Sequence, residues 1–174
     1  LYVDEGRVEE GLTLLKNSAN RGNVWAMRQL GLFFDRQEDM SLAEYWWRKS
    51  SNLGDEVSMD RLGDLYEEAG DLAQAQFWWE KGSDLGNAWS MASLGLLKKR
   101  SGLDQEGGDL LMKAAALGNS WAMRQMGILK MEEGDKVGAE FWWQKAAELD
   151  DDWSLRQMGT LKMEEGDKVG AEFW

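Results

Sequence analysis

The chain has 174 residues, of which 20 are Lys or Arg and 32 are Asp or Glu, so its formal net charge is −12. This acidity disfavours nucleic-acid and anionic-membrane partners and favours a protein partner with basic segments. The sequence has no histidine and no cysteine, which excludes imidazole bases, thiolate nucleophiles and Cys/His zinc sites, and we expect no enzyme activity, no metal and no cofactor.

The composition also predicts a helical protein without a membrane span. The sequence contains no proline, the residue that most strongly breaks helices. It has no apolar run of about 18 residues, the length that crosses a bilayer, and we take the cytoplasm as its default location. The chain begins Leu-Tyr-Val-Asp-Glu, with neither an initiator methionine nor a signal peptide, so we expect a piece of a longer protein.

A repeat of 32 residues runs along the whole chain. It divides the sequence into a partial repeat 1–21, full repeats 22–53, 54–85, 86–117 and 118–149, and a partial repeat 150–174. A glycine after Leu or Met recurs at this spacing, at Gly31, Gly63, Gly95, Gly127 and Gly159. Tryptophan pairs recur with the same period, at 46–47, 78–79 and 142–143, and leucine pairs replace them at 14–15 and 110–111. Such a fixed period is the signature of a repeat architecture.

Each full repeat is expected to form two helices, and the repeat 118–149 shows the signals most clearly. Apolar residues with helical spacing predict helices near 120–132 and 136–148. Between them, Gly134 suits the left-handed residue after a helix end, and Asp135 suits the cap of the next helix. A turn this short makes the two helices antiparallel. Pairs of this kind bury their apolar faces by stacking, which predicts an all-α solenoid.

These features resemble the tetratricopeptide repeat and, more closely, its Sel1-like relatives. The family pattern has an apolar residue, a Leu-Gly pair and an aromatic residue on the first helix, then small, aromatic and alanine residues on the second. The residues that fit this pattern are Met59, Leu62, Gly63, Tyr66, Ala139, Trp143 and Ala146. The period is shorter than the usual ~34 residues, and the usual proline is absent.

The resemblance implies a right-handed superhelix whose first helices line a concave face that binds a peptide or a protein. One variant of the family clamps carboxylates with a lysine and an asparagine at set first-helix positions. Those positions hold Arg124 and Ile128 in one repeat and Arg156 and Thr160 in the next, so we do not expect that clamp. The residues that we expect to bind a partner are Asp60, Asp64, Glu67, Trp89, Trp121, Arg124, Ile128, Trp153 and Arg156.

Several of these residues have a structural interpretation as well. The tryptophan pairs predict core packing, with sugar binding as the alternative. The series Trp25, Trp89, Trp121 and Trp153 is either exposed as interface anchors or packed on the preceding repeat. The acidic residues Asp60, Asp64, Glu67 and Glu68 share a helical face and form either a docking patch or a solvated surface.

Two further segments depart from the repeat. The repeat 86–117 has Lys98-Lys99-Arg100 and two glycines, 107 and 108, inside its second helix, and we expect it to be the weak point of the array because interior glycines destabilise helices. The three aspartates 150–152 are more typical of a helix cap than of a metal site.

The function predicted from the sequence is a protein–protein interaction scaffold. The first alternative is a structural module that associates with copies of itself through the open ends of the array. The second alternative is a carbohydrate-binding protein.

Overall fold

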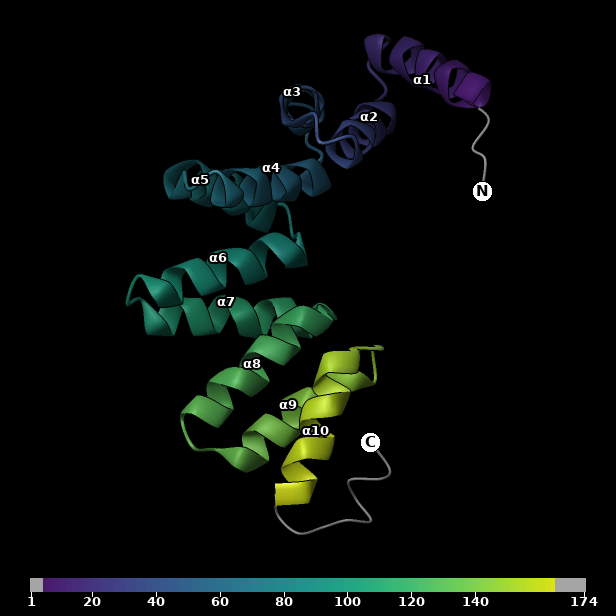
Figure 1. Ribbon diagram of the computed structural model, residues 1–174. Coiled ribbons are helices and arrows are strands. Elements are labelled where there is room, and N and C mark those ends of the chain that lie inside the picture. Colours follow the sequence, from purple (N-terminus) through teal and green to yellow (C-terminus); the bar gives the residue numbers. More distant parts are fainter. Residues whose placement is uncertain (1–4, 165–174) are drawn as a thin grey trace. The chain divides into compact units, whose positions relative to one another are not determined.

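The computed structural model describes residues 5–164, and these residues form ten helices and no strand (Figure 1). The first helices of the repeats are α2 (Val24–Arg36), α4 (Glu56–Glu68), α6 (Ala88–Arg100), α8 (Ser120–Glu132) and α10 (Asp152–Glu164). The second helices are α1 (Glu5–Asn20), α3 (Met40–Ser51), α5 (Leu72–Asp84), α7 (Asp104–Ala116) and α9 (Lys136–Ala147). Both sets begin at a 32-residue spacing from α2 onward, which confirms the all-α repeat fold.

The turns between paired helices form as the glycine and aspartate signals predict. Gly70 and Gly134 take positive φ angles of +79° and +78°, which only glycine adopts without strain. Asp71 and Asp135 then cap the following helices, and their side chains accept hydrogen bonds from the amides of Gln74 and Gly138. The same pair at Gly166-Asp167 and the terminal Trp174 lie outside the described residues.

A contact between glycine and tryptophan holds the two helices of a pair together. A Cβ atom added at Gly63 would lie 2.2 Å from Nε1 of Trp79, and one added at Gly127 would lie 2.3 Å from the ring of Trp143. The first helix therefore needs glycine because the indole of the second helix lies directly on its backbone. The tryptophan pairs are core residues, as predicted: Trp46, Trp47, Trp78, Trp79 and Trp143 are buried, and Trp142 is partly buried.

In the repeat 86–117 the two paired helices pack together without a tryptophan between them. Gly107 is buried in α7, and a Cβ atom there would lie 2.5 Å from the carbonyl oxygen of Gly95 in α6. Glycine is required here so that the two helices can approach closely. The expectation that Gly107 and Gly108 are both helix defects is therefore wrong for Gly107, while a Cβ atom at Gly108 would meet nothing within 4 Å.

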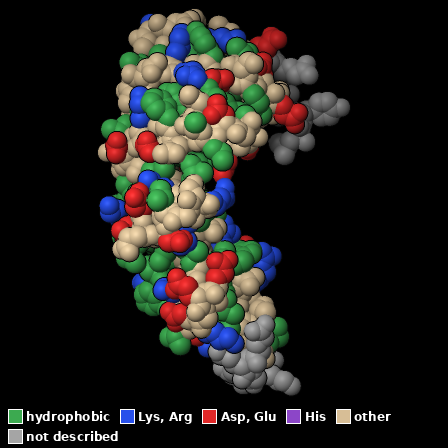
Figure 2. All heavy atoms as spheres, turned by 90° about the vertical axis from the view of Figure 1, so that its left-hand side faces the viewer, with side chains coloured by type: hydrophobic (Ala, Val, Ile, Leu, Met, Phe, Trp, Pro, Cys, Tyr) green, Lys and Arg blue, Asp and Glu red, His purple; other side chains and the backbone are tan. Residues whose placement is uncertain are grey.

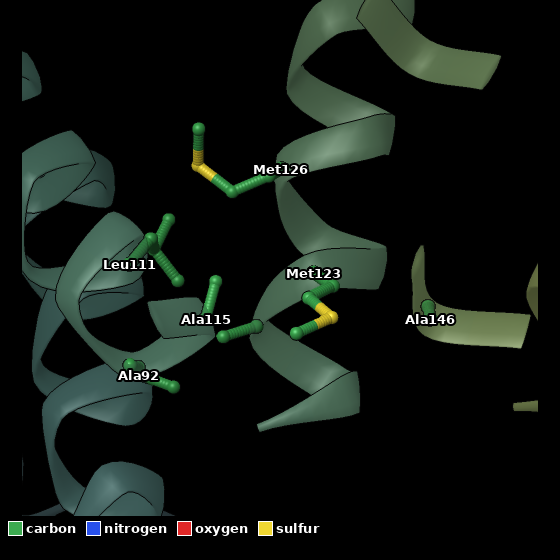
Figure 3. Close-up of a cluster of buried hydrophobic side chains, with 8 residues drawn as sticks. Ala92, Leu111, Ala115, Met123, Met126 and Ala146 are labelled. Carbon is green, nitrogen blue, oxygen red and sulfur yellow. The ribbon is translucent and has the colours of Figure 1, made fainter. Parts of the chain in front are cut away.

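The described residues divide into two compact units, one ending at Ser90 (unit 1) and the other beginning at Met91 (unit 2). The continuity of the array over residues 1–174 stays a prediction. In unit 2 the largest cluster of buried side chains joins α6, α7, α8 and α9, and Figure 3 shows Met126 extending from α8 toward the helix that carries Leu111 and Ala115. No helix among the described residues is long and apolar enough to cross a membrane.

Candidate partner-binding surface

A groove on the first helices of unit 2 lies between α6 and α8, and we call it the α6–α8 groove. It has a volume of about 760 Å³. Its apolar side chains are Leu96, Ile128 and Leu129, and its charged side chains are Lys99, Arg100, Asp104, Glu132 and Glu133. A concave site with apolar residues and a few placed polar groups is the usual form of a binding site.

The repeat explains why these side chains meet. Leu96 and Ile128 occupy equivalent positions 32 residues apart, and so do Arg100 and Glu132. Because 96 and 100, like 128 and 132, are four residues apart, each pair shares one helix face. Stacking α8 beside α6 therefore places apolar side chains side by side, with opposite charges near the C-terminal ends of the two helices.

Neighbouring ion pairs fix part of the rim of the groove. Lys99 Nζ lies 3.1 Å from Asp104 Oδ1, and Lys130 Nζ lies 2.7 Å from Glu133 Oε2. The hydrogen bond to Glu133 raises the pKa of Lys130. Arg100 and Glu132 are both exposed, so charged side chains of both signs line the groove together with its apolar residues.

The predicted anchors of unit 2 are held by contacts within the chain. Trp153 packs edge-on against Trp143 of the preceding repeat, with ring centroids 6.0 Å apart. The guanidinium of Arg124 lies 5.7 Å from the centre of the Trp153 ring, and its Nη1 lies 3.6 Å from Asp151 Oδ2. Ile128 also packs partly into the cluster of Trp143. Arg124 and Trp153 thus have a structural role at the contact between repeats.

Trp121 and Arg156 complete the predicted set in this unit. Trp121 is partly buried and packs against the cluster that contains Leu111 and Met123. Arg156 is exposed on α10. Of the residues predicted for unit 2, only Ile128 lines the α6–α8 groove. Leu96, Gln125 and Glu132 were missed, although Leu96 and Glu132 lie 32 positions from Ile128 and Arg100, a spacing that could have identified them.

The contact of Arg124 has a counterpart in unit 1. Arg28 Nη1 lies 2.9 Å from Asp55 Oδ1, and both residues are 96 positions before Arg124 and Asp151. Asp55 and Asp151 also accept hydrogen bonds from amides at the start of the next first helix. An arginine on one first helix thus reaches the cap of the following one, which joins consecutive repeats.

Asp60 occupies the position equivalent to Arg28. The prediction that Asp60 belongs to an exposed acidic surface is wrong. Only 8% of Asp60 is exposed, and Ser90 Oγ donates a hydrogen bond to its Oδ1 over 3.1 Å. Burial and, to a lesser degree, the charge of Asp64 raise the pKa of Asp60 to about 7. Asp60 is therefore a buried side chain and does not share an exposed face with Asp64.

The rest of the acidic surface is partly available. Asp64 is partly exposed, lies 3.8 Å from Arg61 and accepts a hydrogen bond from Trp79 Nε1 over 3.3 Å. Glu67 is half-buried and Glu68 is exposed. In this unit Trp25 and Trp89 are 57% and 52% exposed, so the tryptophans of this series are not all packed alike.

Charge is not segregated on the face drawn in Figure 2. Acidic, basic and hydrophobic side chains are interspersed over it. Recognition on such a surface depends on local arrangements such as the α6–α8 groove rather than on one extended charged patch.

The fold is shared with solved helical-repeat structures. A protective antigen present in uropathogenic Escherichia coli strains, which displays an SLR fold, matches with a TM-score of 0.76 and 25% identity over 92% of this chain and 38% of that chain. A Sel1 repeat protein from Oxalobacter formigenes matches with a TM-score of 0.79 and 20% identity over 95% of this chain and 76% of that one. The Pseudomonas aeruginosa protein pilF matches with a TM-score of 0.68 and 18% identity, over 97% and 88% of the two chains.

This chain therefore spans less than half the length of the Escherichia coli antigen. No protein-family model matches it, and no curated protein does. The resemblance drawn from the sequence is confirmed by the structures: the chain has the fold of Sel1-like and tetratricopeptide repeat proteins.

Proposed function

We propose that the chain is a protein-interaction scaffold that binds a segment of a partner protein in the α6–α8 groove. The observation that carries this proposal is the groove itself, about 760 Å³ in volume, lined by apolar residues and by charged residues of both signs. Apolar side chains of the partner would supply affinity. The pairing of its charges with Arg100 and Glu132 would fix its direction.

The acidic side chains of α4 in unit 1 support contact with a basic segment of a partner protein. Asp64, Glu67 and Glu68 lie on α4 and would attract a basic segment. With the net charge of −12, this predicts association that weakens as the salt concentration rises. Binding, rather than catalysis, is the function that these surfaces support.

The experiment that tests this function is a pull-down with the chain as bait at low and high salt. The binding variant carries Arg100→Glu, Ile128→Asp and Glu132→Lys. An aspartate occurs at the equivalent position of the repeat 54–85, as Asp64. The variant should lose a partner that the parent retains.

A control variant carries Lys136→Glu, Val137→Ser and Gln144→Lys. These residues are exposed on the second helix α9, and the three substitutions change the net charge by −1, as the binding variant does. Retention of the same proteins by the binding variant would place recognition elsewhere. If the parent retains no protein and its mass rises with concentration, self-assembly through the repeat ends replaces partner binding.

A further inference from the structure

A side-chain cluster on unit 1 covers one of the repeat tryptophans. The guanidinium of Arg48 lies 5.6 Å from the centre of the Trp78 ring. Arg48 Nε donates a hydrogen bond to Glu44 Oε1 over 2.7 Å, and Tyr66 bonds to both residues. The hydrogen bond from Tyr66 is the main cause that lowers the pKa of Glu44. Within this Arg48 cluster, the guanidinium of Arg48 is the cation beside Trp78, and Glu44 and Tyr66 accept its hydrogen bonds.

The equivalent positions of unit 2 lack this cluster. Sixty-four residues further along, Glu44, Arg48 and Tyr66 are replaced by Gly108, Met112 and Lys130, while the tryptophan is kept as Trp142. Two cavities flank Met112. One, of about 450 Å³, is lined by residues that include Ala115, Met123 and Trp142, and the other, of about 320 Å³, by residues that include Gly108, Met126 and Lys130.

The lining of the larger cavity favours an apolar occupant. Met112, Ala115, Ala116, Met123, Trp142 and Leu149 line it, with Lys145 and Glu148 as its charged residues. Met112 is 52% exposed, and methionine adapts its shape to different neighbours. The smaller cavity is more polar, because Lys99, Asp104, Asp109, Lys130 and Glu133 also line it.

We propose that the larger cavity beside Met112 is a docking site, the Met112 site, for an aliphatic or aromatic side chain of a partner polypeptide packed against Trp142. Lys145 and Glu148 also line the larger cavity and would contact polar groups of that polypeptide beside its apolar side chain. This cavity lies mainly between the second helices α7 and α9 and shares no lining residue with the α6–α8 groove. It therefore does not depend on the proposed function of that groove.

The absence of cysteine from the sequence allows a direct chemical test. Ala116 is exposed and lines the larger cavity, so Ala116→Cys places one thiol at its rim. Small disulfides with isobutyl, benzyl or guanidinoethyl tails are exchanged against a reductant, and the labelled fraction is measured by mass spectrometry. The matched control is Asn52→Cys, because Asn52 is exposed at the equivalent position of unit 1, beside the Arg48 cluster.

The isobutyl and benzyl tails should resist reduction at least tenfold better at position 116 than at position 52, and the guanidinoethyl tail should show no such preference. Adding Gly108→Glu, Met112→Arg and Lys130→Tyr to the chain with Ala116→Cys rebuilds the unit 1 cluster and should abolish the preference. Adding Arg48→Met to the chain with Asn52→Cys should create a preference for the isobutyl and benzyl tails at position 52. This second variant keeps the test decisive if the rebuilt variant does not fold.

A second arm tests the partner class. Peptides displayed on phage and selected on the cysteine-free chain should carry a leucine, methionine or phenylalanine anchor, and Met112→Arg should weaken their binding at least tenfold. Equal labelling by all tails at position 116, a preference there for the guanidinoethyl tail, or selected peptides that bind Met112→Arg unchanged would overturn the proposal.

Discussion

Burial of Asp60 predicts that the protein becomes more stable when this carboxyl group is neutralised. The pKa of Asp60 is raised from 3.8 to about 7, because burial disfavours the charged form. A group whose pKa is higher in the folded state binds more protons when folded, so the free energy of unfolding rises as the pH falls through 7 toward 4. We therefore expect Asp60→Asn to stabilise the protein at pH 8.

The magnitude follows from the two pKa values. Their difference is about 3 pH units, and each unit corresponds to about 1.4 kcal/mol. The upper limit of the stabilisation is therefore roughly 4 kcal/mol at pH 8, falling toward zero near pH 4. Asparagine keeps an oxygen that can accept the hydrogen bond from Ser90 Oγ, so the substitution leaves that contact in place.

The assay is urea unfolding, followed by tryptophan fluorescence, of the parent and Asp60→Asn between pH 4 and pH 8. Glu68→Gln is the control, because it removes the same charge from an exposed position of the same helix and should change the stability by no more than about 0.5 kcal/mol. A difference between parent and Asp60→Asn that does not vary with pH would refute the buried, raised-pKa description of Asp60.

Three other predictions concern the repeat contacts and can be checked by the same unfolding assay at pH 7. Gly127→Ala should lower stability by about 1–3 kcal/mol because the new methyl group collides with the indole of Trp143. A methyl group added by Gly108→Ala would meet no neighbouring atom, so this change should raise stability by about 0.5–1 kcal/mol. Equal effects of Gly127→Ala and Gly108→Ala would contradict the contact between Gly127 and Trp143. Asp135→Ala should cost about 1 kcal/mol by leaving the amide of Gly138 without its cap; no loss would show that the turn does not depend on this cap.

The repeat architecture was predictable because its signals are local. Gly134 and Asp135 define a turn whatever the neighbouring repeats contain, and both have the predicted conformation or hydrogen bond. The period then places every other helix, so the expected helix over 120–132 agrees with α8 and the expected 136–148 ends one residue later than α9.

The surface residues were less predictable because their exposure depends on contacts between repeats. Helical periodicity places Asp60 on the face of Asp64, but it does not show that Ser90 of the next repeat covers Asp60. The same limit applies to Trp153, which Trp143 of the preceding repeat contacts. The sequence did contain a signal that position 60 lies at a contact between repeats. The equivalent residues Arg28 and Arg124 are each followed, 27 positions later, by the aspartate that caps the next first helix.

The glycines of the repeat 86–117 illustrate the remaining difficulty. From the sequence alone, Gly107 and Gly108 are both predicted to weaken their helix. The crossing of α6 and α7 distinguishes them, because Gly95 lies opposite Gly107 alone. To distinguish the two glycines, the positions of both helices must be known, and the periodicity of one helix does not give the position of the other.

Photo-crosslinking shows whether the α6–α8 groove contacts a partner protein. A benzophenone amino acid is placed at Gln125, which lines the groove, and in a separate chain at Val137, which is exposed on α9. We expect a discrete crosslinked partner from position 125 that is absent from position 137 and is lost when Arg100→Glu and Glu132→Lys are added. The same products from both positions, or no discrete product from position 125, would contradict partner binding in the groove.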